Sequence, residues 1–191
     1  AIAPDISGVV TAAAALTMPA HNSGAIAMGA NKITGLGAPT VAGDALRYEN
    51  LYTQGARVYH SVNQNIADST YVILAFDSER YDTDTIHDTV TNNSRLTCKT
   101  AGKYVFSVNV RRPGNATGVR ELGFLLNGVT SIGLSYQDSP GTTVFYFNSS
   151  TIYELAVNDY VEIRVWQNSG ITLAINSAGN ISPEFAMQRI G

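Results

Sequence analysis

The sequence is poor in charge: only 14% of its 191 residues are charged, against about 25% in an average soluble domain. Its 12 basic and 15 acidic side chains give a net charge of −3, which excludes a broadly basic nucleic-acid-binding chain. Cys98 is the only cysteine, so an intrachain disulfide and a multi-cysteine zinc site are both excluded. No apolar run approaches the ~18 residues that span a bilayer, and we expect no membrane insertion.

The hydrophobic fraction is 45%, enough for a substantial core, but charge is unevenly distributed along the chain. Residues 1–55 carry only five charged side chains. That segment is too apolar for a linker, and its Gly and Pro residues interrupt any long helix. We therefore predict a front segment at 1–55 and a globular domain at 56–191. The chain begins at Ala1 rather than Met, which we interpret as processing or as a piece of a longer protein.

Short apolar triplets of period two recur between Leu16 and Leu36 and are separated by turn residues. One copy of such a ribbon has almost no core of its own, whereas identical chains wound around one axis would share one. We predict an intertwined trimeric shaft, either β-structured or helical. A flexible Ala/Gly-rich tail is the alternative.

Residues 56–191 have the pattern of an all-β domain. Apolar and more polar residues alternate in 104–111 and in 160–166, where we expect Glu162 and Arg164 to face solvent. Asn127-Gly128 is a strong hairpin signal because both residues tolerate positive φ. About ten short strands of this kind predict a jelly-roll sandwich. The other expected strands are 71–76, 122–126, 144–147, 152–157, 171–175 and 185–190.

Two motifs stand out in this domain. Residues 96–106 contain Gly-x-Tyr-x-Phe, and residues 155–163 read Leu-x-x-Asn-Asp-x-Val-x-Ile. Both resemble segments of the complement first-component globular head, although Asn158 stands where that family has Gly. Residues 185–187 are similar to its last central strand. The resemblance implies a ten-strand jelly roll of the tumour necrosis factor type that is assembled as a tight trimer.

The front segment lacks the collagen-like Gly-X-Y repeat of the complement proteins. Residues 31–45 instead read Asn-Lys-Ile-Thr-Gly-Leu-Gly-Ala-Pro-Thr-Val-Ala-Gly-Asp-Ala. This stretch resembles bacteriophage tail-fibre shafts, and 76–88 is similar to the version of the head found in phage and bacterial proteins. The resemblance implies an extracellular fibre tip on the virion, which joins other tail proteins through its N-terminus and attaches to a host-cell receptor. Alternatives are a structural fibre or decoration protein, or a bacterial exported or spore-surface protein.

An acidic segment suggests one cofactor. Asp77, Glu79, Asp82 and Asp84 lie close together in sequence, and calcium is bound by several oxygen ligands. If the segment is a strand, Asp82 and Asp84 point to the same side, as a ligand pair requires. The spacing does not match an EF-hand loop. Calcium is therefore a hypothesis, and the alternative is a solvated loop whose carboxylates pair with nearby arginines.

Two regions are candidates for receptor binding. Arg111 and Arg112 end a strand before a Gly/Asn/Thr loop, an exposed position suited to an anionic surface polymer; the alternative is intersubunit pairing with the acidic segment. Aromatic rings with amide and carboxylate neighbours are typical of glycan sites. Subunit packing is the alternative for the single tryptophan. The glycan candidates are Tyr136, Asp138, Trp166 and Asn168.

The sequence does not predict an enzyme. His21, His60 and His87 are scattered, and neither a G-x-S-x-G elbow nor an H-E-x-x-H motif occurs. A glycosidase carboxylate pair in the acidic segment is a weaker alternative, because such enzymes usually have a longer scaffold. We interpret Cys98 as a small buried apolar residue.

Overall fold

The computed structural model describes residues 54–139 and 141–191, so the predicted shaft lies outside the described residues. Within this part of the chain, no helix is long and apolar enough to cross a membrane. The secondary structure consists of β-strands. They are β1 (Gly55–Tyr59), β2 (Gln64–Ile66), β3 (Val72–Ile73), β4 (Ser78–Asp82), β5 (Arg95–Thr97), β6 (Gly102–Arg112), β7 (Val119–Leu126), β8 (Thr130–Asp138), β9 (Phe145–Leu155), β10 (Tyr160–Gln167), β11 (Leu173–Ile175) and β12 (Glu184–Arg189).

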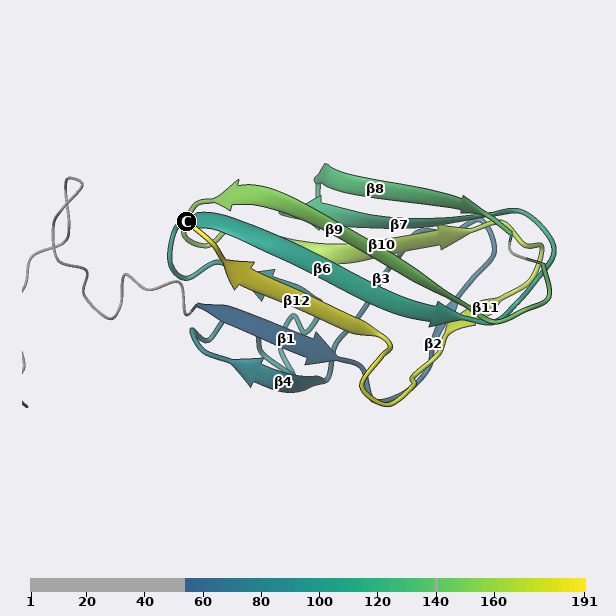
Figure 1. The fold of residues 1–191 in the computed structure, drawn as a ribbon, viewed down its shortest axis with the longest axis horizontal. Helices are drawn as coiled ribbons and strands as arrows, with labels where there is room; N and C mark the ends of the chain where they lie inside the picture. Colours follow the sequence, from purple (N-terminus) through teal and green to yellow (C-terminus); the bar gives the residue numbers. More distant parts are fainter. Residues whose placement is uncertain (1–53, 140) are drawn as a thin grey trace, which may run out of the picture. The chain divides into compact units, whose positions relative to one another are not determined.

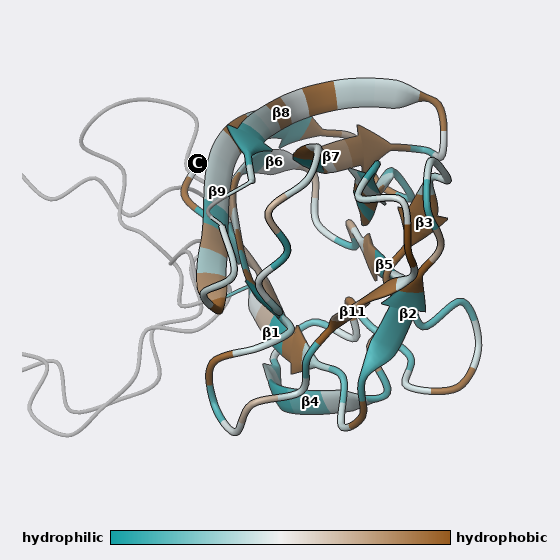
Figure 2. Cartoon of the chain, turned by 90° about the vertical axis from the view of Figure 1, so that its right-hand side faces the viewer, coloured by the Kyte–Doolittle hydropathy of each residue, from teal (hydrophilic) through white to brown (hydrophobic). Residues whose placement is uncertain are grey.

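Two antiparallel sheets lie face to face around one core (Figure 1, Figure 2). The first, here named the front sheet, has the strand order β4-β1-β12-β6-β9. The second, the back sheet, has the order β3-β10-β7-β8, with β5 also paired to β10. β2 and β11 form a separate two-stranded sheet. The predicted all-β sandwich is confirmed.

β6 is the central strand of the core. Every second side chain from Tyr104 to Val110 is buried, as the alternation in the sequence predicted. Phe106 packs against Phe124 of the back sheet and Phe185 of β12, with ring centroids 6.2 Å and 6.4 Å away. Fully burying such a side chain stabilises the fold by about 1.5–3 kcal/mol, so this cluster holds the two sheets together.

Two turns depend on residues with positive φ. Asn127 and Gly128 have φ of 51° and 71° and join β7 to β8, which confirms the predicted hairpin. Asn158 has φ of 73° in the turn between β9 and β10. Asparagine tolerates this conformation better than most residues other than glycine, which explains why Asn serves where the complement heads have Gly.

The predicted strand bounds differ most from the structure in two places. β9 is one strand of 11 residues rather than two, because its polar middle, 148–151, stays paired to β6 along its whole length. Conversely, only Val72–Ile73 of the apolar run 71–76 is a strand. The side chain of Gln64 takes the place of a neighbouring strand there: it accepts from the amide and donates to the carbonyl of Ala75, both at 2.8 Å.

The outer face of the back sheet holds a buried charge that the sequence pattern did not predict. Glu162 faces away from the core, yet it is only 7% exposed. Its Oε1 accepts hydrogen bonds from Ser94 Oγ at 2.7 Å and from Arg95 Nε at 3.2 Å. The expected exposure of Glu162 is therefore wrong, because neighbouring side chains cover it. Cys98 is fully buried, as predicted, and burial raises the pKa of its thiol.

Candidate functional site

The described domain has two distinct ends. Arg189 N donates to Gln54 O and Lys103 N donates to Gly191 O, so the first and last described residues lie at one end, here named the proximal end (Figure 1). β6, β8 and β10 run away from it. The opposite, distal end is formed by the loops that follow these three strands, 113–118, 139 with 141–144, and 168–172.

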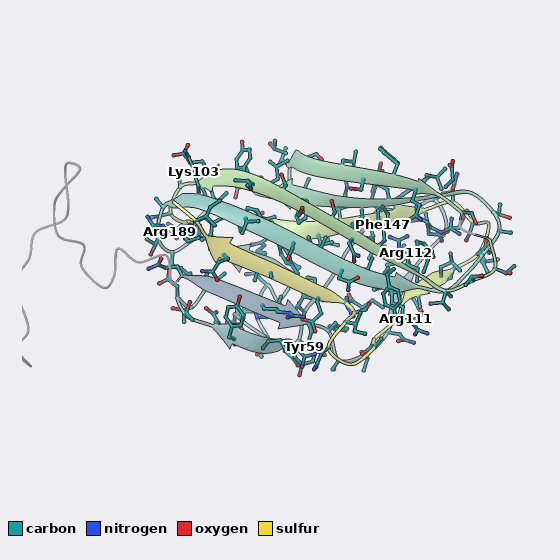
Figure 3. All side chains as sticks on the ribbon, in the orientation of Figure 1. Tyr59, Lys103, Arg111, Arg112, Phe147 and Arg189 are labelled. Carbon is teal, nitrogen blue, oxygen red and sulfur yellow. The ribbon has the colours of Figure 1, made fainter. Side chains whose placement is uncertain are left out.

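Arg111 and Arg112 end β6 at the distal end, as predicted, but they point in opposite directions (Figure 3). Arg111 is half-buried, whereas Arg112 is 1% exposed. The Arg112 guanidinium donates to the carbonyls of Trp166 at 3.3 Å and Glu121 at 3.0 Å. The expected exposure of Arg112 is wrong, because Arg112 has the same strand parity as the core residues Tyr104 to Val110.

Arg112 shares the distal interior with a second buried arginine. Arg120 of β7 is 0% exposed and donates to the carbonyls of Thr117, Val119 and Asn115 at 2.9–3.3 Å. Among the residues described, neither guanidinium forms an ion pair. Burial and the charge of Arg120 lower the pKa of Arg112 to about 9. The pair therefore serves to bind backbone carbonyls, including those of loop 113–118.

Tyr136 and Trp166 lie on one face, the outer face of the back sheet. The register pairs Trp166 with Glu121, and Glu121 with Tyr136, so the three side chains form a line across β10, β7 and β8. Tyr71, just before β3, extends this line: its ring centroid lies 6.2 Å from that of Trp166 at an interplanar angle of 37°. We name Tyr71, Trp166, Glu121 and Tyr136 the aromatic row.

Glu121 is the buried centre of the aromatic row, with 1% exposure. Its carboxylate accepts from the Tyr71 hydroxyl at 3.3 Å and from the Arg164 guanidinium at 3.1 Å. Arg164 also stacks 4.4 Å from the centroid of the Tyr71 ring. The negative charge of Glu121 raises the pKa of the Tyr136 hydroxyl. One carboxylate thus acts on three neighbouring side chains of this face.

Asp138 and Asn168, the polar partners predicted for these rings, both lie next to Val119. Asp138 ends β8 opposite Val119, and Asn168 Oδ1 accepts from Val119 N at 2.6 Å. Gly118 makes this approach feasible, because a Cβ at that position would lie 2.3 Å from Asn168 Oδ1. Asp138 and Asn168 are exposed at the distal edge of the aromatic row.

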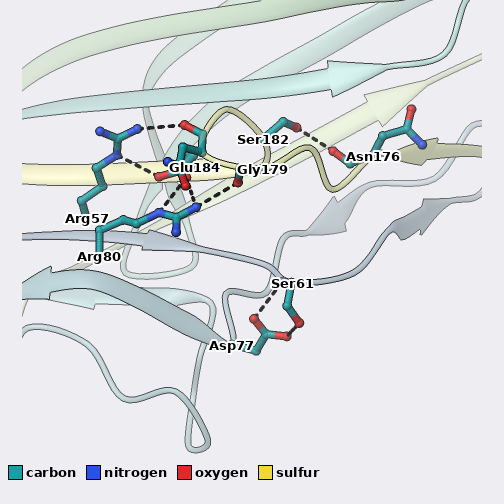
Figure 4. Close-up of polar contacts among 9 residues, drawn as sticks. Arg57, Ser61, Asp77, Arg80, Asn176, Gly179, Ser182 and Glu184 are labelled. Atoms are coloured by element: carbon teal, nitrogen blue, oxygen red, sulfur yellow. Dashed lines mark hydrogen bonds and ion pairs between the residues drawn. The ribbon is translucent and has the colours of Figure 1, made fainter.

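The acidic segment does not converge on one site. Asp77 accepts from the amide and hydroxyl of Ser61 at 2.9 Å and 2.6 Å (Figure 4). Glu79 contacts His87 Nδ1 at 2.9 Å. These two carboxylates of the predicted calcium set are each held by a different partner within the chain.

The remaining two carboxylates hold a turn. β4 ends at Asp82, so the expected strand parity of Asp82 and Asp84 is wrong. Asp82 accepts from three backbone amides, those of Asp84, Ile86 and His87, at 2.8–3.0 Å, and Asp84 accepts from Thr100 Oγ1 at 3.0 Å. No group of three or more potential metal ligands occurs in the described ranges. The predicted calcium site is therefore not formed by these carboxylates.

The outer face of the front sheet carries a shallow trough of roughly 830 Å³. Its floor consists of the small side chains of Ala186, Ser107 and Ser150, which are neighbours in register on β12, β6 and β9. Asn109 Oδ1 is buried there, and none of the described residues forms a hydrogen bond to it. No sequence pattern indicates this surface, because its residues come from five strands that are separated in the chain. Its lining also includes Arg57, Tyr81, Asn148, Glu184 and Gln188.

Solved structures reveal the fold to which this arrangement belongs. No protein-family model and no curated protein sequence matches the chain. The globular domain of zebrafish complement 1qA is 13% identical with a TM-score of 0.50, over 73% of this chain and 98% of that one. The described domain is a jelly roll of the complement-head and tumour necrosis factor type. Murine APRIL is 9% identical with a TM-score of 0.54, over 71% and 98%. Eiger TNF from S. frugiperda is 12% identical with a TM-score of 0.51, over 72% and 92%.

These identities establish a shared fold and nothing finer. The jelly roll confirms the predicted fold class of the globular domain.

Proposed function

We propose that this chain forms the head of a homotrimeric viral fibre on the virion and attaches it to a host-cell surface. The observation that carries this proposal is the separation of the two ends of the domain. The first described residue and the C-terminal residue lie at the proximal end, and the loops after β6, β8 and β10 lie at the opposite end of the domain. A fibre tip needs this polarity, because its shaft enters at one end and its receptor binds at the other.

The trough on the front sheet supports assembly into a trimer. Its floor of small side chains and the unpartnered Asn109 Oδ1 leave room and a hydrogen-bond acceptor for another chain. Tyr146 and Ile152 of β9 are 47% and 61% exposed beside it. If the exposed side chains of β9 on one chain contact the trough of the next, two different surfaces of identical chains meet. Such a contact is heterologous, and it generates a closed ring when the rotation that relates neighbouring chains closes. The family resemblance of the sequence implies that this ring has three members.

The same geometry supports the proposed attachment. With the front sheets directed toward a shared axis, the back sheets and the distal loops of all three chains remain accessible. Weak sites repeated three times per tip gain apparent affinity through multivalency, by roughly 10² to 10⁴ overall. The receptor that we propose is a host-surface glycan, and the predicted junction with other tail proteins belongs to the front segment, outside the described residues.

Light scattering coupled to gel filtration, together with adsorption of the labelled protein to a panel of bacterial strains, tests the proposal. We expect a mass of three chains and adsorption to at least one strain. Ser150→Arg should place a charge in the trough and yield monomers with roughly a hundredfold weaker adsorption. Val129→Arg, an exposed change in the turn after β7, is the matched control. A wild-type monomer would refute the trimer, and a trimer that adsorbs to no strain would favour a structural fibre.

A further inference from the structure

The aromatic row presents three rings of different exposure on one flat face. Tyr71 and Tyr136 are 54% and 64% exposed, and Trp166 is half-buried between Tyr71 and Glu121. Neighbouring strands lie about 4.8 Å apart, so the row extends over roughly 14 Å from Tyr71 to Tyr136. That length suits several rings of a ligand in line.

The rings are positioned before any ligand arrives. Glu121 accepts the Tyr71 hydroxyl and the Arg164 guanidinium, and Arg164 in turn stacks on the Tyr71 ring. A buried carboxylate with such partners restricts the rotamers of the side chains that it binds. Rigid aromatic side chains lose little conformational entropy on binding, which favours affinity for a ligand that offers only modest contacts.

The charges of this face indicate which ligands it suits. The negative charge of Glu121 is balanced by Arg164, with which it forms an ion pair. Arg112, which would have attracted an anionic polymer, is buried beneath the sheet. Asp138 adds an exposed carboxylate at the distal edge of the row, where it repels polyanions and accepts hydrogen bonds from hydroxyl groups.

We infer that the aromatic row is the receptor site of each head and binds a neutral oligosaccharide. The inference rests on the proposed attachment function and gives it a ligand class and a location. The apolar faces of sugar rings stack on Tyr71, Trp166 and Tyr136, while ring hydroxyls bond to Asp138, Asn168 and the tyrosine hydroxyls. The row faces outward on the back sheet, so each head of a trimer built through the front sheets keeps its own site.

A glycan array with neutral and acidic oligosaccharides, read alongside adsorption to the bacterial panel, tests the inference. We expect the wild-type protein to bind neutral members. Tyr71→Ala and Tyr136→Ala should each weaken binding roughly tenfold, the usual loss for an aromatic anchor. Both tyrosines are largely exposed, so these variants should fold. Tyr153→Ala, at the proximal part of β9 and 38% exposed, is the matched control and should bind as the wild type does.

Each other outcome has a defined meaning. If the wild type adsorbs to cells and the Tyr71→Ala/Tyr136→Ala double variant adsorbs equally well, the aromatic row is not the receptor site, although the attachment function stands. If the wild type binds only acidic oligosaccharides, the neutral ligand class is wrong. If it binds neither cells nor glycans while remaining a trimer, the attachment function and the inference fail together.

Discussion

Glu184 provides a direct test of how this chain uses its few charges. The carboxylate is 4% exposed and accepts Arg57 Nε at 2.8 Å and two donors of Arg80 at 2.9 Å and 3.1 Å (Figure 4). The same arginines donate to the carbonyls of Asn180 and Gly179. Glu184 thus joins β12, β1 and β4 to the loop that precedes β12, and it lines the trough.

The expected cost of Glu184→Gln follows from these contacts. A hydrogen bond to a charged group contributes about 1.5–3 kcal/mol, and partial exposure of both arginine side chains, 44% and 28%, reduces each contribution. A glutamine retains one acceptor oxygen but no charge. We therefore expect a loss of about 2 kcal/mol in the free energy of unfolding, and about 3–4 kcal/mol for Glu184→Ala, which leaves two arginines unpaired.

Urea denaturation at one fixed protein concentration measures this loss, because the proposed trimer would make stability depend on protein concentration. A loss of about 2 kcal/mol should lower the melting temperature by roughly 4–8 °C. Glu154→Gln, an exposed glutamate of β9, is the matched control and should stay within about 0.5 kcal/mol of the wild type. If Glu184→Gln is equally neutral, the carboxylate is not a stabilising centre, and its burial needs another explanation.

Three further substitutions test separate parts of the structure. Gly118→Ala should destabilise the distal loops by about 1–3 kcal/mol in urea denaturation, because Gly118 has φ of 76° and lies against Asn168. Tyr104→Phe should cost about 1–2 kcal/mol, since the Thr100 carbonyl loses its donor; an unchanged midpoint would refute the importance of this bond. Burial raises the pKa of Asp77, but hydrogen bonds from Ser61 outweigh it and leave the pKa lowered. Its contribution is therefore present above the unfolded pKa of about 3.9 and is lost as the pH falls through the lower folded value. Asp77→Asn should flatten the acid dependence of stability below about pH 4.

The strands that the sequence predicted best are those with one buried face. In β6 and β10, apolar and more polar residues alternate along the sequence. Each of these strands is paired on both sides within its own sheet, and its inner face meets the core. The same alternation, continued by two residues beyond Val110, places the side chain of Arg112 on the core side of β6. Its burial could therefore have been predicted from the sequence. β9 was predicted as two strands for a different reason: the outer residues of its middle line a trough of polar side chains, so no apolar period marks residues 148–151.

The candidate site illustrates what depends on tertiary pairing. Tyr136 and Trp166 are 30 positions apart in the sequence, and only the pairing of β8, β7 and β10 brings them together across Glu121. Tyr71 joins them from a segment that contributes a strand of two residues. The acidic segment shows the converse: carboxylates close together in sequence bond to separate parts of the chain, Asp77 to Ser61 and Asp84 to Thr100. β4 ends at Asp82, so Asp84 lies in the turn that follows the strand.

The sequence contains few charged residues, and the fold buries several of them, which lowers the charge of the surface further. Five charged residues of the described domain are buried: Arg112, Arg120, Glu121, Glu162 and Glu184. The surface of the described domain is therefore poorer in charge than the sequence alone indicates. Alongside Arg57 and Glu184 in the trough and Glu121 in the aromatic row, hydroxyl, amide and aromatic groups make up these two surfaces. Such groups lose little solvation on contact compared with ions, which suits the proposed contacts with identical copies on one sheet and with a neutral saccharide on the other.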